Sequence, residues 1–104
     1  MSQSRLDALQ AMLAQDPGNS FVRYGLAQAM ASAGQFREAV AQYRELLTHD
    51  PLYVAAYYHG GQALERTGDV DGARSMYEEG LEACTRKGDL HTRSEIQAAL
   101  DILG

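Results

Sequence analysis

The sequence predicts an all-α fold, an antiparallel helix-hairpin solenoid of about six helices in a single domain. Two observations carry this prediction. The 104 residues are rich in Ala, Leu, Gln, Glu and Arg, which favour helices, and include only two prolines. The chain also repeats itself at a spacing of 34 residues, and each repeat has the apolar pattern of two helices joined by a tight turn.

The repeat aligns residues 20–53, taken as repeat one, with residues 54–87, taken as repeat two. Most positions differ between the copies, so the identities are informative. The residues that recur are Tyr24/Tyr58, Gln28/Gln62, Ala29/Ala63, Gly34/Gly68, Ala39/Ala73, Tyr43/Tyr77, Glu45/Glu79 and Leu47/Leu81.

Residues 1–17 precede the repeats and form the first expected helix. An apolar stripe on one face consists of Leu6, Leu9, Met12 and Leu13. Asp16-Pro17 ends this segment, and the same pair returns 34 residues later as Asp50-Pro51. Residues 1–17 are therefore expected to be half of a preceding repeat.

Within each repeat, glycine is expected to end the first helix. Gly34 and Gly68 stand where a helix commonly ends in a left-handed conformation, which glycine tolerates best. Asp69 can then cap the second helix of repeat two, whereas Gln35 is a poor cap in repeat one.

The second helix of each repeat is expected to pack closely on its neighbours. Ala39 and Ala73 are small enough for close helix approach, and Tyr43 and Tyr77 follow one turn later. We assign these two tyrosines, together with Tyr57, to the core.

Residues 88–104 are expected to form a C-terminal capping helix that begins after Asp89. One apolar face is predicted to consist of Leu90, Ile96, Ala99, Leu100 and Leu103. This helix would shield the end of the stack, as a short solenoid requires.

The 34-residue pattern resembles the tetratricopeptide repeat family, and the whole layout resembles small stand-alone bacterial proteins of that family. In repeat one the family's places hold Arg23, Leu26, Ala27, Met30, Gly34, Ala39, Tyr43, Leu46 and Pro51. In repeat two they hold Tyr57, Gly60, Gly61, Leu64, Gly68, Ala73, Tyr77, Gly80 and Thr85. The departures are Arg23 in place of an aromatic residue, Leu46 in place of a small one, and Thr85 in place of the final proline.

The resemblance implies a TPR-like superhelix whose first helices line a concave groove. It implies a non-catalytic protein–protein interaction module that binds a peptide or protein segment there. The family's groove-facing places, with the terminal helix added, give as candidate site residues Phe21, Tyr24, Gln28, Tyr58, Gln62, Glu65 and Arg93. Thr92 and Ile96 are expected to face the groove beside Arg93.

Two other interpretations concern the partner. The Lys, Asn and Arg residues with which some family members grip a carboxyl terminus are missing from the matching places, so chaperone tails are not expected. The alternative function is a structural or self-association module, a homodimer whose candidate contacts are Phe21, Tyr53 and Leu103.

Composition argues against several other classes. The net charge is −5 with dispersed basic residues, which disfavours nucleic acid and favours a neutral or mildly basic peptide. The sequence has no apolar stretch long enough for a membrane span or for a signal peptide, so a cytoplasmic protein is expected. The histidines lack metal-ligand spacing, so we expect no metal, no cofactor and no enzyme activity. We interpret His59 as solvated and the single Cys84 as a packed thiol.

Overall fold

The computed structural model describes residues 2–104, with side chains from residue 3 onward, and over that range it contains six α-helices and no strand. The helices are α1 (Ser2–Gln15), α2 (Ser20–Ser32), α3 (Phe36–His49), α4 (Val54–Thr67), α5 (Val70–Lys87) and α6 (Leu90–Leu103). The predicted all-α helical-repeat fold is confirmed.

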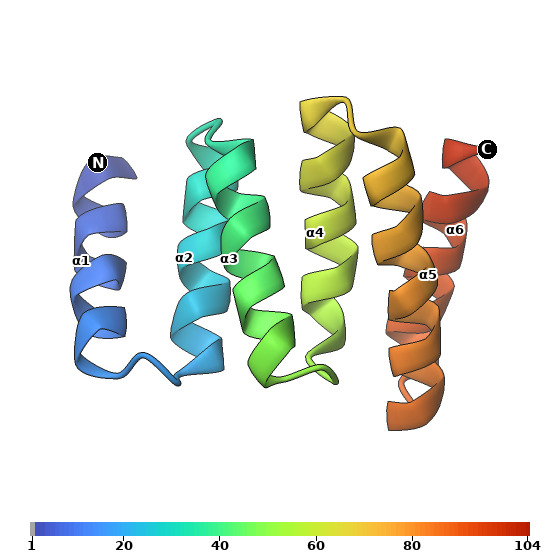
Figure 1. Ribbon diagram of the computed structural model, residues 1–104, viewed down its shortest axis with the longest axis horizontal. Coiled ribbons are helices and arrows are strands. Elements are labelled where there is room, and N and C mark those ends of the chain that lie inside the picture. The colour runs from blue at the N-terminus through green and yellow to red at the C-terminus, as the bar shows by residue number, and fades with distance from the viewer. Residues whose placement is uncertain (1) are drawn as a thin grey trace.

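Successive helices run antiparallel and pack side by side, from α1 at one end of the molecule to α6 at the other (Figure 1). The first helix of each repeat, α2 or α4, packs on the second, α3 or α5. In addition, α4 contacts both α2 and α6. The helices α2, α4 and α6 therefore share one side of the stack, and α3 and α5 form the other.

Glycine and Asp residues set the turns as the sequence predicted. Gly34 and Gly68 have φ angles of 82° and 86°, and α4 ends directly before Gly68. The Asp69 carboxylate accepts a hydrogen bond from the Gly72 amide at 2.8 Å at the start of α5. Sequence reasoning missed the cap of α2, where the Asn19 side chain accepts from the Val22 amide at 3.0 Å.

The core runs between the two sides of the stack. Ala39, Ala73 and Tyr77 are fully buried, and Tyr43 and Tyr57 are almost so. Small residues opposite these rings make the packing tight: a β-carbon at Gly61 would lie 2.2 Å from the Tyr77 ring. The predicted core tyrosines are confirmed, and they fix how closely the two helices of a repeat approach.

One residue of α6, its first, does not lie on the face that was predicted for it. Ile96 is fully buried, and its Cδ1 would lie 2.9 Å from a β-carbon at Gly80 on α5. Leu90, predicted to share this apolar face, is 74% exposed. Packing of Ile96 against α5 therefore determines which side of α6 faces the protein.

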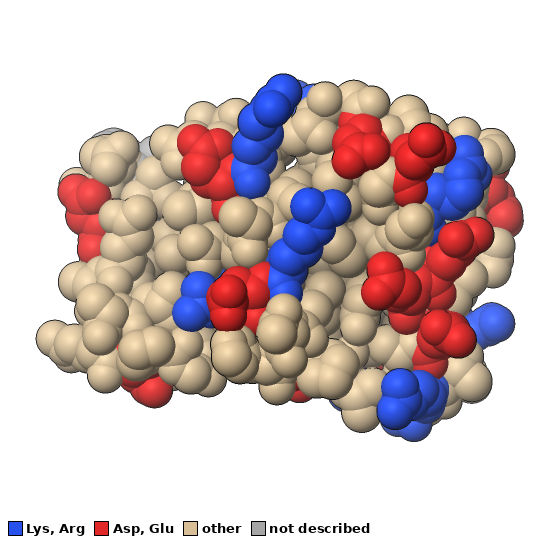
Figure 2. Space-filling view, viewed as in Figure 1, with Lys and Arg blue, Asp and Glu red and all other residues tan. Residues whose placement is uncertain are grey.

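The surface formed by α3 and α5 carries charges of both signs. Lys and Arg side chains lie among Asp and Glu side chains there, and the acidic ones gather toward the α5 end (Figure 2). Across residues 2–104, no helix is both long and apolar enough to cross a membrane.

Candidate functional site

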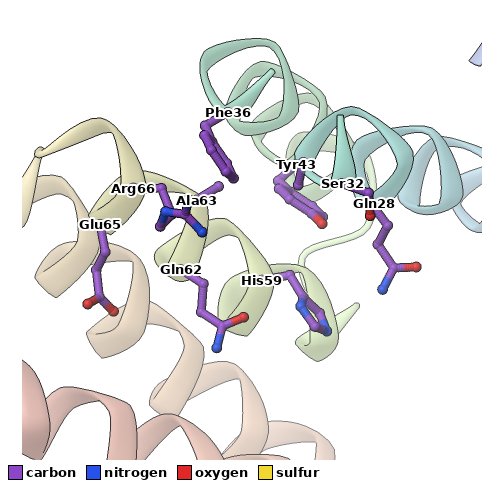
Figure 3. A pocket seen from close by; sticks show the side chains of 10 residues that line it. Gln28, Ser32, Phe36, Tyr43, His59, Gln62, Ala63, Glu65 and Arg66 are labelled. Atoms are coloured by element: carbon purple, nitrogen blue, oxygen red, sulfur yellow. The ribbon is translucent and has the colours of Figure 1, made fainter. Parts of the chain in front are cut away.

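Two adjoining cavities follow the side of the stack formed by α2, α4 and α6. The larger, about 550 Å³, lies between the first repeat and α4, and Figure 3 shows it. The smaller, about 330 Å³, lies between α4, α5 and α6. Gln62 and Glu65 line both cavities, so the two lie next to each other along this surface, which we call the groove.

Five of the predicted site residues lie in or beside the groove. Gln28, Gln62 and Glu65 line the larger cavity, and Tyr58 lines the smaller one with the last two. Tyr24 is half-buried, and its hydroxyl accepts a hydrogen bond from Gln28 Nε2 at 3.2 Å. The structure thus brings the recurring Tyr and Gln residues of both repeats to one surface.

The other two predicted residues lie elsewhere. Phe21, in the first turn of α2, is 76% exposed and lines neither cavity. Arg93 donates from Nε to the Thr85 hydroxyl at 3.1 Å and so ties α6 to the end of α5. Thr92 bonds to the capping carboxylate of Asp89.

A different face of α6 borders the groove. With Ile96 turned into the core, the neighbouring helical positions are the ones that line the smaller cavity: Glu95, Ala98, Ala99 and Ile102. Sequence reasoning selected none of the four for the groove, because it placed Ala99 on the face that packs against the stack and assigned Thr92, Arg93 and Ile96 to the groove instead. The contact between Ile96 and Gly80, which sets the rotation, has no local signal in α6.

Aromatic side chains pack against one another beside the groove. The Tyr24 ring centroid lies 5.2 Å from the Tyr53 centroid and 5.8 Å from the His59 centroid. The His59 and Tyr58 ring centroids are 5.2 Å apart. His59 is half-buried and lines the larger cavity, so its interpretation as a solvated side chain was wrong. Burial lowers the pKa of His59, so its ring is neutral at neutral pH.

Polar groups project into the larger cavity from three helices. Gln28 on α2 and His59 and Gln62 on α4 point into the open space, and Tyr43 on α3 turns its oxygen toward it (Figure 3). The Arg66 guanidinium lies over the Phe36 ring, with its central carbon 4.5 Å from the ring centroid. Sequence reasoning assigned Tyr43 to the core alone and did not select Arg66.

Glu65 has a partner within the protein. The Tyr77 hydroxyl donates a hydrogen bond to its carboxylate, and this contact, together with burial, raises the pKa of Tyr77. Burial is the larger cause, and the negative charge of Glu65 adds to it. The Tyr77 hydroxyl therefore stays protonated and holds Glu65 at the boundary between the two cavities.

The groove offers hydrogen bonding and aromatic contact. Its amide, hydroxyl and carboxylate groups can donate to or accept from a peptide backbone. Cys84 lies outside it, fully buried as predicted, and burial raises the pKa of its thiol. Among residues 2–104 no three His, Cys, Asp or Glu side chains gather closely enough to hold a metal ion.

The residues proposed for self-association are spread along the molecule. Phe21 is the most exposed of the three, whereas Tyr53 is half-buried against Tyr24. Leu103, near the end of α6, packs partly against the core. A further cavity of about 580 Å³ lies on the opposite side, between α3 and α5, and no predicted site residue lines it.

Comparison with known proteins gives relatives of the same repeat architecture. A model of the tetratricopeptide repeat matches residues 24–87. A tetratricopeptide repeat-containing protein of Pseudomonas aeruginosa is 30% identical over 95 residues, which cover 91% of this chain and 90% of that protein. The solution structure of a Bordetella parapertussis protein is 37% identical, covers 94% of this chain and 85% of its own, and has a TM-score of 0.82.

A more distant structural likeness includes a bound peptide. The type III secretion chaperone SycD of Yersinia enterocolitica, in a crystal structure with a peptide of the translocator YopD, is similar with a TM-score of 0.89. The superposition covers 98% of this chain and 79% of that one, at 18% identity. At this identity the likeness is one of fold.

Proposed function

The chain belongs to the tetratricopeptide repeat family, and on that premise we propose that it is a non-catalytic interaction module that binds a peptide or protein segment in the groove. The observation that carries the proposal is that the two cavities of the groove adjoin. They meet at Gln62 and Glu65, so one extended segment can contact both repeats and α6 at once.

The chemistry of the lining suits a polypeptide. Gln28 and Gln62 recur at the same place in the two repeats, and each amide both donates and accepts. Tyr58, Ala98, Ala99 and Ile102 supply apolar area beside them. A segment with polar main-chain groups and occasional apolar side chains matches this alternation better than a small polar metabolite does.

The solved complex of SycD with a YopD peptide supports the same role for a chain of this fold. For the present protein the partner is proposed to be a protein, with neither nucleic acid nor membrane as the ligand, because the net charge is −5 and the acidic and basic residues are interspersed. A cytoplasmic location is part of the proposal.

The test places a charge where the two cavities meet. Gln62 is exposed and lines both, so Gln62→Lys should fill the groove without disturbing the core. Gln15→Lys makes the same chemical change at an exposed residue at the end of α1, outside the groove. Each variant and the unmodified chain would be immobilised and exposed to extract of the source organism, and retained proteins identified by mass spectrometry.

Groove binding predicts a protein retained by the unmodified chain and by Gln15→Lys but lost with Gln62→Lys. Circular dichroism of each variant confirms that it is folded. Equal retention by all three chains contradicts the groove as the binding surface and directs attention to the cavity between α3 and α5.

Self-association is the second candidate, favoured by two exposed apolar side chains on α2 and α6. Phe21 is 76% exposed and Ile102 is 86% exposed, and Ile102 lines the groove. Sedimentation velocity on the unmodified chain and on Phe21→Ser and Ile102→Ser tests it. A dimer that either substitution dissociates would favour a second copy as the occupant, and a monomer at all concentrations excludes it.

A further inference from the structure

Tyr43 and Tyr77 hold the same place in the two repeats, but their hydroxyl groups have different surroundings. Tyr77 donates to the Glu65 carboxylate. Tyr43 has no hydrogen-bond partner among the residues that the structure describes, although its side chain is 1% exposed and lines the larger cavity. Every fully buried polar atom of the described side chains has a hydrogen-bond partner. Because the Tyr43 oxygen has none, it must be open to the cavity.

Two substitutions between the repeats account for this difference. Ala31 occupies in repeat one the position of Glu65 in repeat two, so repeat one lacks the carboxylate. Ala27 stands in the place of Gly61, and a β-carbon at Gly61 would be 2.2 Å from the Tyr77 ring. The Tyr43 ring therefore cannot lie as the Tyr77 ring does, and Figure 3 shows its oxygen directed at the space between α2 and α4.

The Tyr43 side chain is buried, but its hydroxyl opens into the cavity without a partner in the protein, so it is free to donate to an acceptor on a bound ligand. Resting on the proposed function of the groove, we propose that the Tyr43 hydroxyl donates a hydrogen bond to a carboxylate of the bound segment. That carboxylate would occupy in repeat one the place that the Glu65 carboxylate holds in repeat two.

The cavity contains one positive group, which attracts a carboxylate more than a neutral acceptor. Arg66 lines the same cavity, and none of the described acidic residues lies within 4.0 Å of its guanidinium. The one acid that lines this cavity, Glu65, is already bonded to Tyr77. Burial raises the pKa of Tyr43, so its hydroxyl keeps the proton it would donate.

The whole-chain charge limits the kind of segment. With a net charge of −5, a strongly acidic peptide would be repelled at low ionic strength. A single carboxylate in an otherwise neutral or basic segment satisfies both conditions. The carboxylate can come from an Asp or Glu side chain or from the end of a chain.

The experiment measures retention of peptide libraries by the immobilised protein. Three heptapeptide libraries with random neutral and basic flanks are compared. The first has a central Glu and blocked ends, the second a central Gln and blocked ends, and the third a central Gln and a free carboxyl terminus. Retained peptide is counted by mass spectrometry. Comparing the first and the third library, each with the second, separates side-chain from terminal carboxylates.

Three variants assign the preference to the hydroxyl. Tyr43→Phe removes only the oxygen, and Tyr57→Phe removes an equivalent oxygen that bonds the Pro51 carbonyl outside the groove. Ala31→Glu supplies repeat one with the carboxylate that Glu65 provides in repeat two. Because the Tyr43 hydroxyl has no described partner to lose, Tyr43→Phe should keep the urea midpoint of the unmodified chain, which separates a binding effect from unfolding.

The unmodified chain should retain one carboxylate-bearing library about tenfold more than the Gln library with blocked ends, as expected for a hydrogen bond to a charged group. Tyr57→Phe should keep this ratio, and Tyr43→Phe and Ala31→Glu should reduce it to about one. A ratio near one for the unmodified chain, or one that survives Tyr43→Phe, overturns the inference. Absence of retention for every library overturns it as well.

These outcomes remain separate from failure of the groove itself. If Gln62→Lys abolishes retention of all libraries while Glu and Gln are retained equally, the groove binds peptides without a carboxylate position at Tyr43. If retention is unaffected by Gln62→Lys, the proposed function fails irrespective of Tyr43.

Discussion

Arg23 and Tyr57 stand 34 residues apart and donate hydrogen bonds to equivalent atoms. Arg23 Nη2 lies 3.1 Å from the carbonyl oxygen of Pro17, and the Tyr57 hydroxyl lies 2.8 Å from that of Pro51. Each bond ties the first helix of a repeat to the turn that precedes it. An arginine therefore performs in repeat one the bridging role that an aromatic residue performs in repeat two.

The neighbours of these two residues differ in the corresponding way. Arg23 Nη1 donates to Gln42 Oε1 at 2.7 Å. Met76 holds the place of Gln42 in repeat two, and it lines a cavity together with Tyr57. In repeat one the arginine pairs with the Gln42 amide, and in repeat two the tyrosine pairs with the Met76 thioether. We therefore expect the residues at these two places of a repeat to be energetically coupled.

Exchanging this pair between the repeats tests the coupling. Arg23→Tyr leaves the Gln42 amide without its donor, and Gln42→Met removes the acceptor of Arg23, so each should lower the free energy of unfolding by about 1 kcal/mol. The double variant restores a matched pair, so its loss in free energy of unfolding should be about 1 kcal/mol smaller than the sum of the losses of the two single variants. Urea unfolding of the four chains measures this, and additive effects would contradict the coupling.

Gly61 is required by the ring that lies above it. A β-carbon there would be 2.2 Å from Tyr77 Cε1, so Gly61→Ala should lower the free energy of unfolding by about 1–3 kcal/mol through overpacking. Gly25, in α2, is the matched control, because its β-carbon would meet only Leu9 Cδ2 at an ordinary 3.6 Å. Gly25→Ala should stabilise by about 0.5–1 kcal/mol. Thermal melts that move in the same direction for both variants would contradict this assignment.

Gly34 and Gly68 are required by the backbone alone. Their φ angles are 82° and 86°, and no atom lies within 4 Å of an added β-carbon at either. Alanine at either position should lower the free energy of unfolding by about 1–2 kcal/mol, the cost of a left-handed conformation. Gly18→Ala, in a turn with open space and no positive φ, should change it by less than about 0.5 kcal/mol. Unchanged urea midpoints for Gly34→Ala and Gly68→Ala would show that the strain is absent.

The sequence predicted what depends on period and local chemistry. The 34-residue spacing, the glycines at 34 and 68 and the Asp69 cap are each specified within a few residues of the chain, and all are present. The groove residues that recur, Gln28 and Gln62, were expected from the resemblance to the tetratricopeptide repeat family, whose groove-facing places they hold. These features do not depend on how one helix rotates against another.

The rest of the groove depends on such rotation. Which face of α6 lines the smaller cavity is decided by the contact of Ile96 with Gly80, residues on different helices. The Tyr43 hydroxyl lacks a partner because of Ala27 and Ala31. The significance of these two alanines emerges only from comparison with Gly61 and Glu65, which hold the same places in repeat two. Contacts between side chains on different helices determine these orientations, and the periodicity of apolar residues along one helix does not predict them.

His59 should make stability depend on pH. Its ring is half-buried between Tyr24 and Tyr58, and burial lowers its pKa below the ordinary value of 6.5. The unfolded chain, with the ordinary pKa, therefore takes up a proton before the folded chain does. The contribution of neutral His59 to stability is fully present above pH 6.5 and is lost as the pH falls from 6.5 through the lowered folded value.

Urea midpoints measured at pH 7.5 and pH 5.0 on the unmodified chain and on His59→Gln isolate this effect. Glutamine keeps a polar side chain at the groove but does not titrate, so the fall in midpoint between the two pH values should be smaller in the variant than in the unmodified chain. The carboxylates, whose titration lies mainly below this range, affect both chains alike. An equal fall in the two chains would show that the His59 ring is protonated as readily in the folded state as in the unfolded one.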